Sequence, residues 1–145
     1  MPGLNHSINE NTLRTFFLSR FSGFRNSKYE CFGRWTNHID EDIKNKNTCG
    51  SIPDIMIISK QDKIIYIGEA KQLKDYKADI SSFTFKNSKQ LDNYISYLNK
   101  KKFNCYEKFL VYSVPTFCVR TTRNEIKKKL ITKNAKFDFE VITIT

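Results

Sequence analysis

The sequence predicts an α/β protein in which helices pack against a mixed central β-sheet. Two isoleucine-rich runs, at residues 52–59 and 64–71, flank a polar turn and are short enough to be the strands of a β-hairpin. Residues 88–100 have the apolar spacing of an amphipathic helix, and residues 108–114 form the nearly unbroken apolar run of a strand covered on both faces. A chain of 145 residues supports one such core, so we expect a single domain over residues 1–145.

The first helix is predicted over residues 7–21. Four apolar side chains form one stripe along it: Leu13, Phe16, Phe17 and Phe21. Glu10 lies three residues before Leu13 and seven before Phe17, so it shares the face of that stripe. Ser7 and Glu10 also have the spacing of a capping box, in which Glu10 reaches back to the Ser7 backbone. Both interpretations of Glu10 stay open.

Basic and aromatic side chains alternate over residues 20–35. This pattern can stack nucleobases, but burial preferences favour rings in the core and charged groups outside. Residues 36–51 lose the apolar periodicity and fill with Asn, Asp and Lys, which predicts a long loop. Long loops in compact domains are usually functional or mobile. His38 falls in this loop, and we expect it to be solvated.

The hairpin brings three charged side chains together. It is centred between Gln61 and Asp62, so Asp54 is predicted directly opposite Glu69, with Cβ atoms roughly 4.5–5.5 Å apart. Two like charges repel there, and Lys71 projects from the same face because side chains alternate along a strand. A hard divalent cation such as Mg²⁺ takes one or two carboxylates, and a lysine beside it can orient or deprotonate a bound water. Such a site would hydrolyse phosphodiesters.

A simpler interpretation of the same residues also stays open. An ordinary surface hairpin would pair Glu69 with Lys71 on one face, and Asp54 would only follow a turn. The two interpretations differ in whether Asp54 belongs to the cluster.

At these residues the chain resembles the PD-(D/E)XK nuclease superfamily, whose signature matches Pro53-Asp54 and Glu69-Ala70-Lys71. The resemblance implies a restriction-endonuclease-like core with Mg²⁺ as cofactor and Mn²⁺ as its substitute. Asp54, Glu69 and the backbone carbonyl of Ala70 would hold the metal, and Lys71 would serve the attacking water. The pattern is most similar to VRR-NUC domains and archaeal Holliday junction resolvases, although the loop at 36–51 departs from the compact resolvases.

The resemblance also implies further site residues. The superfamily often carries an acid on its first helix that completes the metal site, which would be Glu10, with Glu30 as a second candidate. In the helix at 88–100, for which Ser88 is the expected N-cap, Gln90 and Tyr94 resemble a Gln-x-x-x-Tyr motif that packs near the active site in several branches. We therefore count Gln90 among the catalytic residues.

The carboxyl-terminal part predicts a helix and a last strand. Residues 122–125 read as a capping box that opens a basic helix, in which Lys127 and Lys128 either grip phosphates or form a solvated face. The strand begins half-buried, because Phe137, Phe139 and Val141 alternate with acids, but the alternation ends at Ile142. Either a bulge reverses the faces or both faces are covered at the end.

Composition bounds the partners and the compartment. Lys and Arg number 25 against 15 Asp and Glu, giving a net charge of +10 and a pI near 9.5, which favours a polyanionic partner. The four cysteines lack C-x-x-C spacing, which argues against structural zinc. With no membrane-length apolar run and no leader pattern, we expect an intracellular protein, in the cytoplasm or nucleoid.

Together these patterns predict a Mg²⁺-dependent endonuclease that cleaves duplex or branched DNA. We assign nucleic-acid contacts to four residues: Lys74, Tyr94, Lys127 and Lys128. A non-catalytic nucleic-acid-binding module with the same fold is one alternative, and the intact set of two acids and a lysine argues against it. An RNA-cleaving nuclease is the other, since both chemistries use the same metal and water. Cutting two strands takes two active sites, so we also expect a homodimer.

Overall fold

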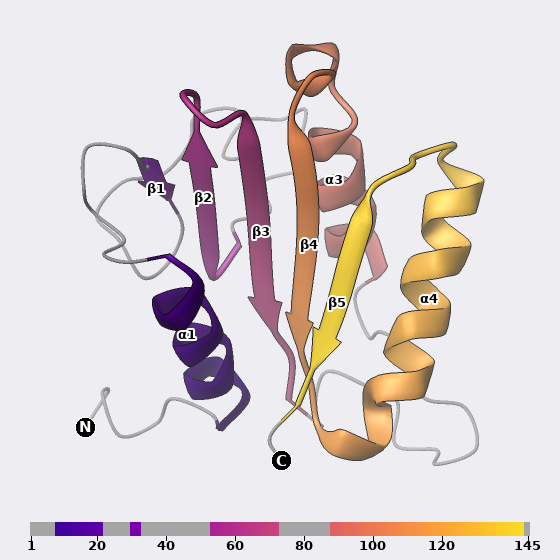
Figure 1. Cartoon of the computed structure of the whole chain (residues 1–145). Helices are drawn as coiled ribbons and strands as arrows, with labels where there is room; N and C mark the ends of the chain where they lie inside the picture. Colours follow the sequence, from indigo (N-terminus) through magenta and orange to yellow (C-terminus); the bar gives the residue numbers. More distant parts are fainter. Residues whose placement is uncertain (1–7, 22–29, 33–52, 73–87, 144–145) are drawn as a thin grey trace.

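The computed structural model describes residues 8–21, 30–32, 53–72 and 88–143 (Figure 1). Three α-helices are described in these ranges: α1 (Ile8–Arg20), α3 (Ser88–Leu98) and α4 (Val119–Thr132). Five strands accompany them: β1 (Glu30–Phe32), β2 (Ile55–Ser59), β3 (Ile64–Ala70), β4 (Glu107–Ser113) and β5 (Asp138–Ile142). Two short 3-10 helices, η5 (Lys101–Phe103) and η6 (Thr116–Cys118), precede β4 and α4. None of the helices in these ranges has the length and apolar character needed to cross a bilayer.

The strands form one mixed sheet in the order β1-β2-β3-β4-β5, which confirms the predicted α/β class. The first three strands are antiparallel neighbours, whereas β3, β4 and β5 run parallel. Parallel neighbours need crossover connections, and α3 and α4 lie on the two crossovers. The parallel strands therefore end at the same edge of the sheet, which is the lower edge in Figure 1.

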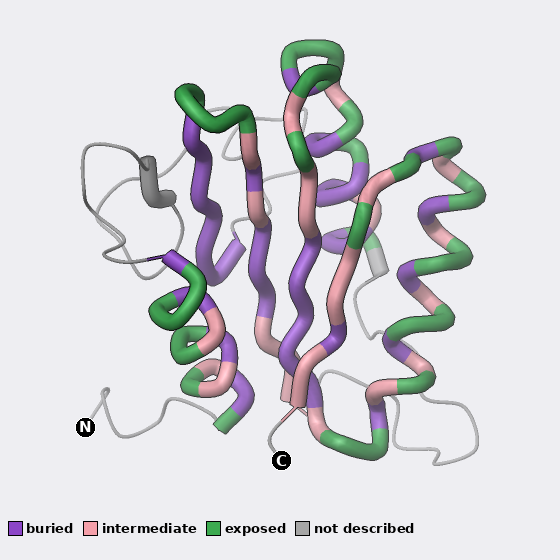
Figure 2. The backbone as a smooth tube through the Cα atoms, viewed as in Figure 1, coloured by how far each residue is buried: buried purple, intermediate pink, exposed green. Residues whose placement is uncertain are grey.

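Helices cover both faces of the sheet. One apolar cluster joins α3 and α4 to one face, through buried residues such as Leu91, Ile95 and Ile126. A second cluster joins α1 to the other face, through Leu13 and Phe17 among others. Figure 2 shows that buried positions run through the central strands and α3, whereas the turn between β2 and β3 is exposed.

The hairpin has the predicted register. Ile55 pairs with Gly68 and Ser59 with Ile64, so the hairpin is centred between Gln61 and Asp62. Residues 60–63 form the turn, and Lys63 there has a φ of 57°, the left-handed conformation that a tight reversal requires. The ladder is shorter than predicted, because β2 begins at Ile55 rather than at residue 52.

The structure shows which faces of β4 and β5 are covered and whether a bulge interrupts β5. In β4, Leu110 and Tyr112 belong to the α3 cluster and Val111 to the α1 cluster, so both faces are covered as predicted. The pairing of β5 with β4 runs without interruption from Asp138 to Ile142, so no bulge reverses its faces. The end of β5 is instead covered on both sides.

The predicted capping box at residues 122–125 is wrong. Helix α4 begins at Val119, and its cap position, Cys118, makes no side-chain capping hydrogen bond. Thr122 lies inside the helix and is fully buried, because it is one turn before Ile126 on the apolar face. The helix therefore continues directly from η6. Helix α3 begins at Ser88 itself, so Ser88 is its first helical residue, and the helix ends at Leu98 rather than at residue 100.

Several predicted features lie outside the described residues. These are the loop at 36–51 with His38, Lys74, and most of the basic and aromatic segment at 20–35. At the start of that segment Phe21 is buried and Arg20 is exposed over the Phe16 ring, at 4.9 Å from its centroid. These two residues agree with the expectation that the rings lie in the core and the charged groups lie outside. Glu30 lies in β1, in register with Ile58, and not in a helix.

Gly68 allows α1 to approach the sheet closely. A Cβ atom at this position would lie 2.6 Å from Phe17 Cε2 and 3.0 Å from Ile55 Cγ2. The Phe17 ring is fully buried and stacks on Phe21, with centroids 5.9 Å apart, so it has little room to move. Only glycine fits here without displacing the helix.

We expect Gly68→Ala to lower the free energy of unfolding by about 1–3 kcal/mol, the usual cost of overpacking a core. Chemical denaturation measures this value. Combining the change with Phe17→Leu should recover part of the loss, because the two substitutions act on one contact. If the two substitutions changed the free energy of unfolding strictly additively, the close contact between Phe17 and position 68 would be contradicted.

Candidate active site

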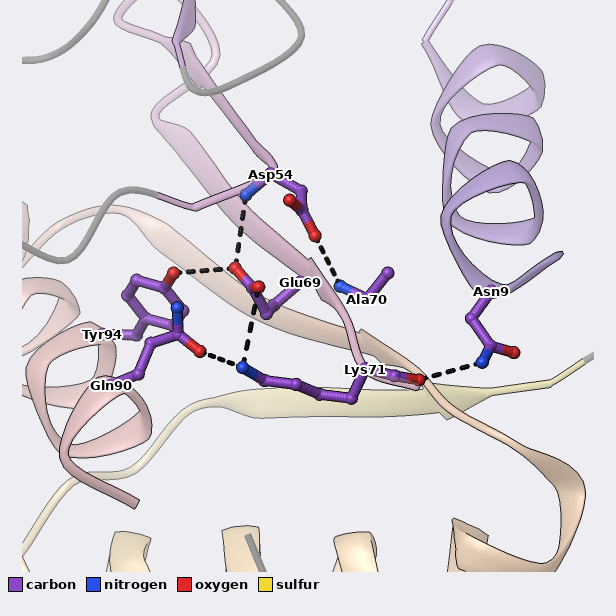
Figure 3. A network of polar contacts seen from close by, with 7 residues as sticks. All are labelled: Asn9, Asp54, Glu69, Ala70, Lys71, Gln90 and Tyr94. Carbon is purple, nitrogen blue, oxygen red and sulfur yellow. Dashed lines mark hydrogen bonds and ion pairs between the residues drawn. The ribbon is translucent and has the colours of Figure 1, made fainter. Parts of the chain in front are cut away.

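The predicted site residues meet at the carboxyl end of β3. Glu69 and Ala70 are its last two residues and Lys71 follows, while Asp54 directly precedes β2. Gln90 and its neighbours on α3 face this end from the crossover that follows β3 (Figure 3). Ligands of open α/β sheets usually bind at the carboxyl ends of parallel strands.

The two carboxylates continue the hairpin where its backbone ladder stops. Asp54 N–H donates to Glu69 Oε1 at 3.3 Å, and Ala70 N–H donates to Asp54 Oδ2 at 2.8 Å. Each acid thus accepts a backbone hydrogen bond from across the hairpin. The two residues are only 3% and 2% exposed, so both carboxylates are held in a dry environment.

Lys71 completes the cluster. Its Nζ lies 3.8 Å from Glu69 Oε2 and donates a hydrogen bond to Gln90 Oε1. Its backbone N–H donates to Ser113 O at 2.9 Å, which ties the residue to the end of β4. The Lys71 side chain is 13% exposed, compared with 3% for Glu69, so Lys71 is the less enclosed member of this ion pair.

Tyr94 holds the Glu69 carboxylate in place. Its hydroxyl donates to Glu69 Oε1 at 2.8 Å, and the residue is 1% exposed. Burial raises the pKa of Tyr94 well above its ordinary value, and the charge of Glu69 beside it raises that pKa further. The hydroxyl is therefore a permanent hydrogen-bond donor to the carboxylate. Since the ring has almost no exposed surface, we correct the predicted role of Tyr94 from contacting nucleic acid to positioning Glu69.

Asn9 is a site residue that sequence reasoning missed. It is buried in the first turn of α1, and its Nδ2 donates to Lys71 O at 2.9 Å. A signal for it exists in the sequence, because Asn9, Leu13, Phe17 and Phe21 step along the helix by four residues on one buried face. Charge singles out Glu10 instead, but Glu10 lies at the edge of that face and is half-buried.

Lys127 and Lys128 stand outside this network. They are exposed on α4, and Lys74 lies outside the described residues. Among the described residues, no group of three or more His, Cys, Asp and Glu side chains comes close enough to hold a metal ion. The structure thus groups two carboxylates, Asp54 and Glu69, without a third acid from Glu10.

The donor set still suits one kind of metal. Mg²⁺ is usually held by one or two carboxylates and keeps several waters, and Asp54 and Glu69 are hard oxygen donors of the kind that it prefers. Softer metals favour sulfur or imidazole, and none of the residues drawn in Figure 3 carries such a group.

The surface-hairpin interpretation is only half right. Its ion pair between Glu69 and Lys71 is present. The hairpin itself, however, is buried on both faces, and Asp54 bonds to the backbone of β3. Asp54 therefore belongs to the cluster.

Comparisons of the chain with protein-family models, with curated proteins and with solved structures find no match.

The titration of Tyr94 gives a prediction about stability. We expect Tyr94→Phe to lower the free energy of unfolding by about 1.5–3 kcal/mol near neutral pH, because the mutation removes a hydrogen bond to a charged group. Above the ordinary tyrosine pKa of 10.0, the unfolded chain releases the Tyr94 proton while the folded protein keeps it. The contribution of the Tyr94 hydrogen bond to the free energy of unfolding is therefore fully present below pH 10.0 and decreases as the pH rises above it.

Denaturant titrations of both proteins at about pH 8 and about pH 11 measure this difference. The difference in free energy of unfolding between wild type and Tyr94→Phe should be smaller at the higher pH. A constant difference would show that the folded and unfolded states release this proton alike, and a widening one that the folded state releases it more readily; either would contradict a raised pKa in the folded protein.

Proposed function

We propose that the protein is a Mg²⁺-dependent endonuclease that hydrolyses phosphodiester bonds of DNA. The observation that carries this proposal is the convergence of Asp54, Glu69 and Lys71 at the end of β3, with both carboxylates buried and hydrogen-bonded across the hairpin. Buried charged groups held by specific partners are costly to a fold and are typical of functional sites. The net charge of +10 favours a polyanionic substrate.

Each residue has a definite task in this proposal. Asp54, Glu69 and the Ala70 carbonyl would hold the metal, which supplies Lewis acidity to the scissile phosphate and a more acidic bound water. Lys71 would orient or deprotonate the attacking water, because its ammonium group lies beside the Glu69 carboxylate that would hold the metal. The basic side chains of Lys127 and Lys128 on α4 would contribute to binding the DNA backbone.

Two neighbours would keep the cluster in its reactive geometry. Gln90 accepts a hydrogen bond from Lys71 Nζ, and Tyr94 donates to Glu69 Oε1. Both come from α3, so one helix would set the separation between the lysine and the acid. Because Asn9 holds the Lys71 carbonyl from the other face, the strand end is fixed from both sides.

The direct experiment is incubation with linear duplex, single-stranded and branched DNA and with RNA, each with Mg²⁺ and with EDTA. Cleavage of DNA that requires Mg²⁺ supports the proposal, and Mn²⁺ should substitute. Cleavage of RNA alone would replace DNA by the RNA-cleaving alternative. Binding without any cleavage would favour a non-catalytic module. Since cutting both strands takes two sites, we also expect a homodimer, which sedimentation would show.

Lys71→Met tests the role of the amine. We expect cleavage to fall by a factor of about 10² or more, the lower range for loss of a general acid or base, because the hydrocarbon stem remains while the ammonium is removed. Thermal melting of the same variant is the control. A variant that neither cleaves nor folds would show that Lys71 is needed for the fold. A variant with full activity would show that Lys71 takes no part in cleavage.

Asp54→Asn separates metal binding from folding. Asparagine can still accept the hydrogen bond from Ala70 N, while one of two neighbouring buried charges disappears. We expect its melting temperature in EDTA to equal or exceed that of wild type. Mg²⁺ should stabilise only the wild type, by roughly 2.7 kcal/mol at a hundred times Kd.

The matched control is Asp54→Ala, which removes the hydrogen bond as well and should be less stable than wild type with or without metal. An Asn variant that gains the same stability from Mg²⁺ as the wild type would remove Asp54 from the metal site.

A further inference from the structure

A polar hollow lies beside the first residues of β4 and β5, at the end of the sheet opposite the candidate active site. These strand starts are at the top of Figure 1. The volume of the hollow is about 550 Å³, inside the range of roughly 300–1,000 Å³ that small-molecule sites occupy. Asn104 lines it together with two rings, two lysines and two acids: Tyr106, Phe137, Lys108, Lys136, Glu107 and Asp138. Strand β3 separates it from the candidate active site by roughly 20 Å, at about 3.3 Å per residue.

The two rings of the hollow are half-buried, so each keeps some exposed surface. The Tyr106 ring packs edge-on against Phe103, with centroids 5.3 Å apart and planes at 77°. Phe103 in turn packs against the buried Tyr97, at 5.3 Å. Tyr106 is therefore anchored by the core, and its half-buried ring borders the hollow.

Lysines lie in the lining and beside the neighbouring rings. Lys63 Nζ lies 5.4 Å from the centroid of the Tyr106 ring, and Lys102 Nζ lies 5.1 Å from that of Phe103. Lys108 and Lys136 stand in the lining itself. Rings interleaved with amines match a nucleic-acid strand, since bases stack on the rings while the amines contact the phosphates.

The acids in the lining fit the same ligand. Carboxylates repel phosphate, but they accept hydrogen bonds from the amino groups at the edges of bases. Glu107 and Asp138 line the same hollow as the two rings, so the hollow offers acceptors for the amino groups of a base as well as apolar surface. A base must be unpaired to lie between these groups, which favours a single strand over a duplex.

We propose that this hollow binds an unpaired nucleotide of single-stranded nucleic acid, with its base against Tyr106 and Phe137 and its phosphates against Lys108 and Lys136. The site is separate from the metal cluster, so binding there does not require Mg²⁺ or cleavage.

The test is fluorescence anisotropy in EDTA, where cleavage cannot contribute. The probes are one labelled sequence as single-stranded DNA, as single-stranded RNA and as duplex DNA. For Lys108→Gln/Lys136→Gln we expect about tenfold weaker binding of the single strands. The salt slope should also be smaller by about 1.4, at roughly 0.7 for each phosphate that the variant no longer neutralises. Weakening with only one of the two single strands would identify which nucleic acid the site takes.

The matched control is Arg120→Gln/Arg123→Gln. It removes the same charge from exposed positions in the first turns of α4, at the far end of the parallel strands. We expect this control to keep the wild-type affinity for single strands within about twofold, as a distant surface change should. Equal weakening by both pairs would show only a general attraction to a basic protein and would overturn the proposal.

Phe137→Leu separates stacking from charge. It keeps an apolar side chain and every lysine, and it should weaken single-strand binding by about tenfold while duplex binding stays unchanged. Tyr106→Leu should do the same, and its melting temperature shows whether it folds; if it does not, Phe137→Leu and the lysine pair decide the question. Unchanged single-strand affinity in Phe137→Leu and in the lysine pair would exclude the site.

Discussion

Between β2 and β3 the backbone ladder stops at Ile55 and Gly68, and two carboxylates take over its hydrogen bonds. Asp54 accepts from Ala70 N–H, and Glu69 accepts from Asp54 N–H, so the acids bind backbone amides rather than face each other unshielded. The rest of the cluster depends on this exchange. Neutral donors and one lysine stabilise two buried charges that would otherwise be costly in a dry environment.

The surrounding fold is arranged to hold this strand end. On one face, α3 brings Tyr94 and Gln90 to the acid and the amine. On the other, the absence of a side chain at Gly68 lets α1 approach, and Asn9 reaches the carbonyl of Lys71. The two helices therefore fix the end of β3 from opposite sides. The candidate active site thus lies at the end of β3 because α1 and α3 pack on opposite faces of the sheet there.

The sequence predicts the parts of this arrangement that follow from local periodicity. The register of the hairpin follows from its turn, so the closeness of Asp54, Glu69 and Lys71 is expected, and the spacing of α3 places Gln90 and Tyr94 on one edge. Asn9 cannot be found by looking for charge, because its contribution is an amide bonded to a backbone carbonyl.

The error at residues 122–125 has a different cause. A threonine three residues before a glutamate can be a helix cap or can lie buried inside the helix, one turn before an apolar residue. Thr122 is buried inside α4. Only tertiary packing separates the two.

The contacts of the cluster also span very different distances along the chain. Asp54 and Ala70 are 16 residues apart and can meet as soon as the hairpin closes, whereas Tyr94 is 25 residues from Glu69 and Asn9 is 62 from Lys71. Contacts of larger separation close longer loops and are slower to form. A nascent chain with only the hairpin formed thus carries both acids in water, where their charge costs little. They lose that hydration only when the helices dock, so the unfavourable step of burying charge is coupled to completion of the fold.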